Sequence, residues 1–190
     1  YGYGGEPTGV PNEAFFPGLP ALMWLGSAVS PLPPPTAGLL ISLVASAIAT
    51  VALSRLADLE YGPGTGVRAV LFWLLAPPAI FLATAYTESL FLAMAIPAWL
   101  AARRGRWPIA GALAAGAMTV RVSGVFLAAA LIVEFLTSPH RRWRDLPWLA
   151  LPGVVLLGWM FYLHTETGDW LAWLHAQQQG WNRSLTLPWA

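Results

Sequence analysis

The chain has 190 residues, of which 57% are hydrophobic and only 10% are charged. Soluble domains carry about 25% charged residues, so this composition excludes an ordinary soluble domain and favours a protein surrounded by lipid. The formal net charge is +1 and there is no basic stripe with interleaved aromatic residues, so we expect no nucleic-acid partner. The absence of cysteine excludes disulfide and thiol chemistry.

Glycine, proline and polar residues dominate positions 1–17, which are predicted to form a loop. Residues 18–30 are apolar but too short to cross about 30 Å of hydrocarbon, so we expect an interfacial or re-entrant helix there. The predicted spans that follow are 36–56, 67–84, 87–102, 107–119, 122–137 and 147–163. Pro77-Pro78 should kink the second of them.

The predicted fold class is therefore all-α, a polytopic transmembrane helix bundle of about six spans plus one interfacial helix. We expect a single membrane domain over residues 1–190, and we interpret the chain as an internal fragment of a longer protein. Its predicted parts are an outer loop with the interfacial helix (1–35), the transmembrane bundle (36–163) and an outer-face tail (164–190).

Arginine supplies all ten basic residues, and its distribution predicts the orientation. With the turn at 103–106 in the cytoplasm, only Arg121 and Arg183 of the ten arginines fall outside. The outer face then collects the loop 1–17, the junctions 84–88 and 119–121, and the tail from His164. Because these segments bring polar groups to one membrane surface, we expect the functional site there.

Glu88 and Arg121 are ionisable residues beside apolar runs, where a charge is costly. They either snorkel to the nearby interface or line one polar pocket in which Arg121 holds an anionic group. Glu13 either complements a helix dipole or belongs to the site. Glu134 is expected to pair with the basic turn at 140–144. No histidine, aspartate or glutamate spacing indicates a metal site.

Several segments together resemble the PIG-V family, the mannosyltransferases that add the second mannose in GPI-anchor synthesis, and their bacterial relatives. They are Gly2-Tyr3, AFFPGLP (14–20), APPAIFLATAYTESLF (76–91) and Arg121-x-x-Gly124, in this order. The tail QQQGWNRSLTLPW (177–189) looks like a later family segment with a Trp-Asn pair.

The resemblance implies a GT-C type glycosyltransferase that uses polyprenyl-phosphate mannose and a glycolipid or glycan acceptor on the outer face. No cofactor is implied, because the lipid-linked sugar is a substrate. Abundant Arg, Ala, Gly, Pro and Trp suggest a bacterial source, and we expect the protein in the plasma membrane with its site on the outer face. The candidate catalytic residues are Glu13 and Glu88, and the candidate substrate-binding residues are Phe16, Pro17, Tyr86, Arg121, Gln178 and Asn182.

Two departures from the family pattern affect these expectations. The family's acidic base belongs to a stretch that would lie before Tyr1, so Glu13 is the fallback in this chain. Val122-Ser123-Gly124 also stands where relatives often have Ser-Asn-Gly.

A transporter or flippase of lipid-linked substrates is the alternative function, because a broken helix and intramembrane charges would suit one as well. A non-catalytic membrane subunit is a third possibility.

Overall fold

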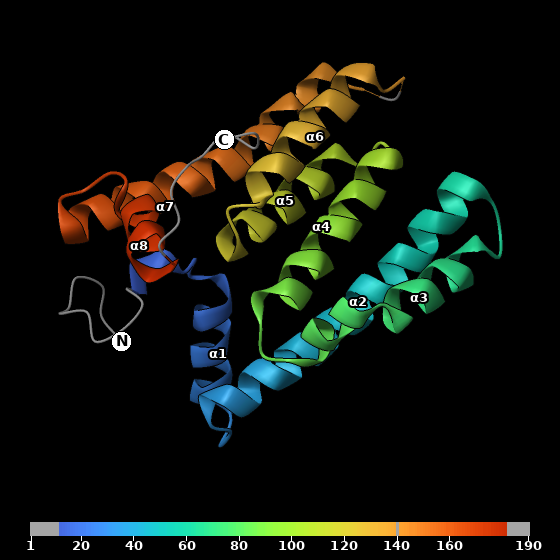
Figure 1. Cartoon of the computed structure of the whole chain (residues 1–190). Helices are drawn as coiled ribbons and strands as arrows, with labels where there is room; N and C mark the ends of the chain where they lie inside the picture. The colour runs from blue at the N-terminus through green and yellow to red at the C-terminus, as the bar shows by residue number, and fades with distance from the viewer. Residues whose placement is uncertain (1–11, 140, 182–190) are drawn as a thin grey trace, which may run out of the picture.

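The computed structural model describes residues 12–139 and 141–181. These residues form helices and no β-strand, which confirms the predicted all-α fold (Figure 1). The elements in chain order are η1 (Asn12–Ala14), α1 (Gly18–Val29), α2 (Pro34–Tyr61), α3 (Thr65–Leu75), η2 (Pro77–Ala83), α4 (Thr87–Arg103), α5 (Trp107–Val120), α6 (Gly124–Thr137), η3 (Trp143–Ala150), α7 (Leu151–Thr167) and α8 (Ala172–Trp181).

Two helices in the described part are long and apolar enough to cross a membrane, α2 and the continuous stretch Trp143–Thr167. A third span is present if α3 and η2 are counted together. The helices α1, α5 and α6 are apolar but shorter. At about 1.5 Å per residue, the 12 residues of α1 fall well short of a bilayer core, as the sequence predicted. The count of six spans stays a prediction.

The predicted span over 67–84 is not one kinked helix. The path of the chain bends by 89° between α3 and η2, at Ala76. The backbone of Ala76 is extended, with φ −70° and ψ 138°. A residue before proline is driven out of the helical region, and Pro77-Pro78 offers no N–H to continue the ladder, so the helix ends and the chain turns sideways.

Two other predicted boundaries also differ from the structure. The connection between the predicted spans 36–56 and 67–84 is much shorter than expected, because α2 continues to Tyr61 and α3 begins at Thr65. The chain reverses there through Gly62 and Gly64, both of which have positive φ. The last long helix runs to Thr167, four residues beyond the predicted end, and Gly168 then ends it in a left-handed conformation.

Buried small residues line the contact between α4 and α5 and let the two backbones approach. The buried alanines of this core are Ala98, Ala101, Ala102, Ala110 and Ala114. Trp107 and Phe135 close its upper end in an edge-to-face contact, with ring centroids 4.9 Å apart. This core therefore packs α4, α5 and α6 against one another.

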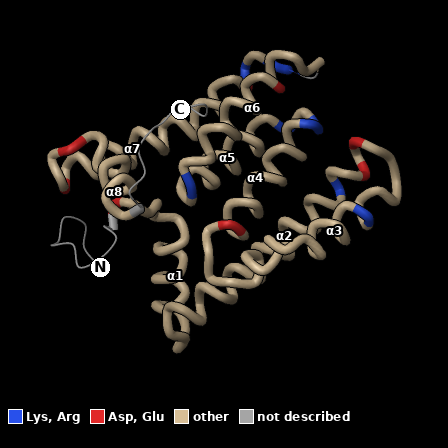
Figure 2. The backbone as a smooth tube through the Cα atoms, viewed as in Figure 1, with Lys and Arg blue, Asp and Glu red and all other residues tan. Residues whose placement is uncertain are grey.

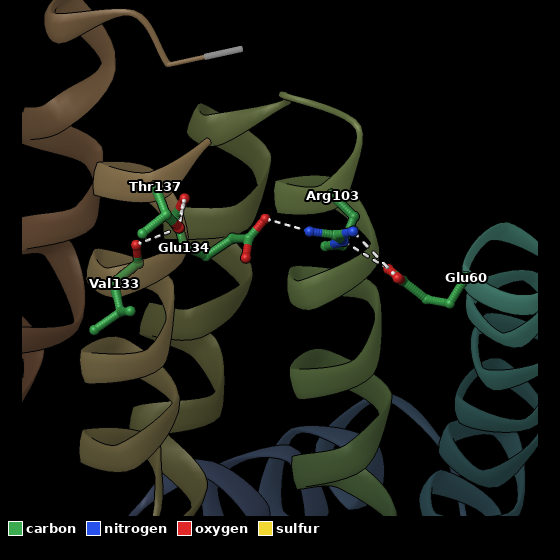
Figure 3. A network of polar contacts seen from close by, with 5 residues as sticks. All are labelled: Glu60, Arg103, Val133, Glu134 and Thr137. Atoms are coloured by element: carbon green, nitrogen blue, oxygen red, sulfur yellow. Dashed lines mark hydrogen bonds and ion pairs between the residues drawn. The ribbon is translucent and has the colours of Figure 1, made fainter. Parts of the chain in front are cut away.

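Charged residues gather at the helix ends and turns, and long uncharged stretches separate them (Figure 2). At the end that carries most of the arginines, Arg103 joins three helices, as Figure 3 shows. Its Nε and Nη2 donate to Glu60 of α2, at 2.6 and 3.1 Å, and its Nη1 donates to Glu134 of α6, at 2.7 Å. Glu134 was expected to pair with the turn at 140–144, but it pairs with Arg103, and no arginine of the described residues 141–144 bonds to it. Arg141 donates instead to the carbonyl of Leu136.

The small-residue contact of α5 gives a stability prediction. A Cβ added at Gly111 would lie 2.2 Å from the carbonyl oxygen of Trp148, whereas nothing lies within 4 Å of one added at Gly153. We expect Gly111→Ala to destabilise the bundle by about 1–3 kcal/mol, because the backbone of η3 must move. Gly153→Ala, the matched control, should leave stability unchanged or raise it. Thermal unfolding in detergent measures both; equal melting temperatures would contradict the packing.

Candidate functional site

Glu88 and Arg121 form an ion pair across 33 residues of sequence, in which Arg121 Nη1 donates to Glu88 Oε1. Glu88 lies in the first turn of α4, and Arg121 directly follows the last residue of α5. A negative charge is favourable at a helix N-terminus and a positive charge at a C-terminus. Because α4 and α5 are consecutive antiparallel helices, the start of one lies beside the end of the other, and the two charges meet.

Both partners keep capacity for a further ligand. Glu88 Oε2 is buried and accepts no hydrogen bond from the described residues. The other guanidinium nitrogens of Arg121 also bind nothing in the described part of the chain. The side chains remain 31% and 37% exposed, so the pair can be reached from outside the bundle. An unsatisfied buried oxygen costs about 1–3 kcal/mol, which favours a hydrogen-bond donor from a ligand at this position.

Three serines hold the junction that leads into Glu88. Ser89 donates to the carbonyl of Leu82 at 3.0 Å, and Ser46 of α2 contacts both Ser89 and that carbonyl. Ser42, one turn away on α2, reaches the carbonyl of Tyr86 at 3.5 Å. These hydroxyls bind carbonyls of η2 and of the loop after it, so they fix where α4 begins.

These serines were not among the residues predicted from the sequence. The available signal was the pair Ser42 and Ser46, four residues apart on one face of a mainly apolar span. The side chain of Tyr86, a predicted binding residue, is 57% exposed and packs edge-on against Phe81. Its position beside the Glu88 junction keeps it available to a ligand.

The segment with Glu13, Phe16 and Pro17 lies on the other side of Arg121. Phe16 is buried against Trp159 of α7 and Trp173 of α8, with ring centroids 6.2 and 5.8 Å away. Val122, next to Arg121, packs on the same cluster. Phe16 is thus a packing residue in this structure, and the cluster ties the N-terminal segment to the Arg121 junction.

Glycine is required where this segment meets α5. A Cβ on Gly18 would lie 2.7 Å from the carbonyl oxygen of Thr119. The carbonyl of Pro17 accepts the first hydrogen bond of α1, from Ala21 at 2.8 Å. Glu13 is buried in η1. The structure therefore brings residues 13–18 next to the 119–122 junction.

α8 covers η1, since Gln177 Nε2 donates to the carbonyl of Ala14 at 2.7 Å. Its neighbour Gln178, the predicted binding residue, is exposed. Asn182 lies outside the described residues. The four segments predicted to share one surface thus lie at one end of the bundle in their described parts. The roles assigned to their residues stay predictions.

The link between α7 and α8 is held by Asp169. Its Oδ1 accepts from the backbone N–H of Leu171 at 2.8 Å, and its Oδ2 lies 2.5 Å from Nδ1 of His175. These contacts, the backbone hydrogen bond first, hold the pKa of Asp169 below its ordinary value. Nearby, His164 stacks on Trp170 with ring centroids 4.2 Å apart. Over 12–139 and 141–181, no three histidine, aspartate or glutamate side chains are placed to hold a metal ion.

Comparison with known proteins gives a family match over most of the chain. A family model described as dolichyl-phosphate-mannose-protein mannosyltransferase matches residues 12–165. GPI alpha-1,6-mannosyltransferase 2 of Mus musculus is 34% identical over 127 residues, which cover 60% of this chain and 25% of that protein. The chain thus spans about a quarter of the length of this relative. No solved structure matches it.

The Glu88–Arg121 ion pair should be measurable as a coupling between the effects of substituting its two residues on the free energy of unfolding. We expect the double-mutant cycle of Glu88→Gln and Arg121→Gln to give a coupling free energy on the order of 1 kcal/mol, because each single change leaves a half-buried group without its partner. Unfolding in a chemical denaturant, in detergent, supplies the four stabilities. Strictly additive effects would show that the pair does not form.

A pH dependence follows from Asp169. A carboxyl whose pKa is lowered on folding stabilises the fold above its ordinary pKa and loses that contribution as the pH falls through the lowered value. We expect hydrogen-exchange protection of the first turn of α8 to drop between neutral pH and about pH 3, after correction for intrinsic rates. Asp169→Asn should give weak protection over the whole range. Equal protection in both proteins would show that the carboxylate does not hold α8.

Proposed function

We propose that this protein moves mannose from a polyprenyl-phosphate donor to a glycolipid or glycan acceptor. The basis is its family, because the chain belongs to the dolichyl-phosphate-mannose-protein mannosyltransferase family. The family match confirms the mannosyltransferase resemblance predicted from the sequence. The donor, the acceptor and the setting at the outer face of a bacterial plasma membrane are part of the proposal.

The observation that carries the chemistry is the Arg121–Glu88 pair with its unused donors and acceptor. Arg121 is proposed to bind the donor phosphate with the nitrogens that Glu88 leaves free. A planar guanidinium can give a phosphate two parallel hydrogen bonds, and it stabilises the negative charge that remains when the sugar is transferred. Glu88 fixes the guanidinium in place through Oε1.

The transfer itself needs one proton acceptor. The oxygen of the acceptor hydroxyl attacks the anomeric carbon, the bond from that carbon to the phosphate oxygen breaks, and the phosphate leaves with the electron pair. The hydroxyl proton passes to a carboxylate. In this chain the candidates are Glu88, through Oε2, and Glu13; the resemblance also implies an acidic residue ahead of Tyr1.

The remaining candidates are proposed to bind the substrates around this pair. Tyr86 and Gln178 expose their side chains at the same end of the bundle and are proposed to contact the sugar or acceptor directly. Pro17 and Phe16 are proposed to act through the position of the N-terminal segment, because Phe16 is buried. Asn182 is proposed as a further contact from the tail.

Transfer of radiolabelled mannose tests the proposal. Full-length protein in membranes would receive labelled polyprenyl-phosphate mannose, and label in glycolipid and glycan would be counted. We expect Arg121→Ala to lower transfer about a hundredfold or more, because the leaving phosphate loses its charge partner. Glu88→Gln should lower it as well. Arg104→Ala, an exposed arginine at the other end of α4, is the control and should transfer normally.

The outcomes separate the competing functions. Normal transfer by both site variants would remove the proposed pair from the mechanism and keep the enzyme. No transfer by wild type, together with movement of the lipid-linked sugar across the bilayer, would replace the enzyme by a flippase. Retention of the folded protein in detergent, measured by size exclusion, shows that a lost activity is not a folding failure.

A further inference from the structure

A groove of about 780 Å³ lies between α2, α3 and α4, away from the Glu88–Arg121 pair. This volume is within the roughly 300–1,000 Å³ range of sites that bind small molecules. The groove is located beside the α2–α3 turn and the last turn of α4, the arginine-rich end in Figure 2. The function proposed above makes no use of it.

The lining changes from polar to apolar in the same order on all three helices. On α2, Glu60 is followed inward by Leu53, about 10 Å deeper at 1.5 Å per residue. On α3, Arg68 is followed one turn deeper by Phe72. On α4, Arg103 lies at the end of the helix and Trp99 lies one turn deeper. The lining residues of the three helices therefore form one amphipathic groove, polar at its mouth and apolar inside.

The charge in the groove is unevenly satisfied. Among the described lining residues Glu60 is the one carboxylate, and both of its oxygens accept hydrogen bonds from Arg103. Arg68 makes no hydrogen bond or ion pair with any residue in the described ranges, and its side chain is exposed. One unpaired guanidinium therefore stands over an apolar channel, which complements a single anionic head and an apolar tail.

We propose that this groove binds one anionic phospholipid from the leaflet beside the arginine-rich turns. The phosphate lies at Arg68, where an arginine fork suits its oxygens, and an acyl chain runs inward along Leu53, Phe72 and Trp99. The exposed ring of Phe72, with 79% of its surface free, becomes covered by the chain. The site is independent of the mannosyl transfer.

Lipid binding to the purified full-length protein in uncharged detergent tests this site. Phosphatidylglycerol and phosphatidylcholine would be titrated, and bound lipid counted by native mass spectrometry. We expect Arg68→Gln to weaken phosphatidylglycerol binding about fivefold, the factor that one basic residue contributes near an anionic surface, and to leave phosphatidylcholine unaffected. Arg104→Gln, outside the groove lining, is the matched control and should bind as wild type does.

A second variant tests the apolar part of the groove. Ala69→Trp fills the channel between α2 and α3, and it should reduce the binding of both lipids. Three results would overturn the proposal: equal binding of the two lipids by wild type, equal effects of Arg68→Gln and Arg104→Gln, or full lipid binding by Ala69→Trp. The last would mean that the lipids bind at a surface other than this groove. Arg68→Gln changes an exposed residue, so its result stands even if Ala69→Trp does not fold.

Discussion

The close approach of α4 and α5 sets the position of the Glu88–Arg121 pair, around which the candidate site is built. Buried alanines of both helices line this contact in place of bulky side chains, which lets the two backbones come close. Glu88 and Arg121 meet because they stand at the same end of this helix pair. Arg103, at the other end of α4, is thereby held between α2 and α6. A wider spacing of α4 and α5 would separate Glu88 from Arg121.

The two ends of the bundle treat charge differently. Arg103 is surrounded by two carboxylates, and all three of its nitrogens that point at them are used. That arrangement fastens helices together and leaves nothing for a ligand. Arg121 uses one nitrogen, and Glu88 uses one oxygen. Arginine and glutamate therefore hold helices together at the Arg103 end and form an incompletely bonded pair at the Arg121 end. This difference is the physical reason for proposing the reaction at the Arg121 end.

Much of the fold could be predicted from the sequence, because uninterrupted apolar runs of helical length have few alternatives in lipid. The separation of Arg121 from most other arginines, and its nearness to Glu88, followed from alternating the runs across a membrane. The sideways turn at Ala76 was underestimated, since the Pro77-Pro78 pair predicts a disrupted helix but not the direction of the chain after it. The serine hydroxyls bind carbonyls of η2 only because the chain takes that direction, so these hydrogen bonds could not be predicted. Phe16 was assigned to binding, and only the tertiary contacts with Trp159 and Trp173 show that it is buried.

The break at Ala76 has a consequence for the surrounding bilayer. The 11 residues of α3 rise only about 16 Å, roughly half of the hydrocarbon thickness, before the chain runs sideways as η2. Lipids that border α3 have a short apolar wall on one side, and a bilayer thins to match a short wall. Water and head groups would then sink toward η2 and the start of α4. Under the proposed function, this depression would let a lipid-linked phosphate reach Arg121 without leaving its own leaflet, and a thicker membrane would oppose that contact.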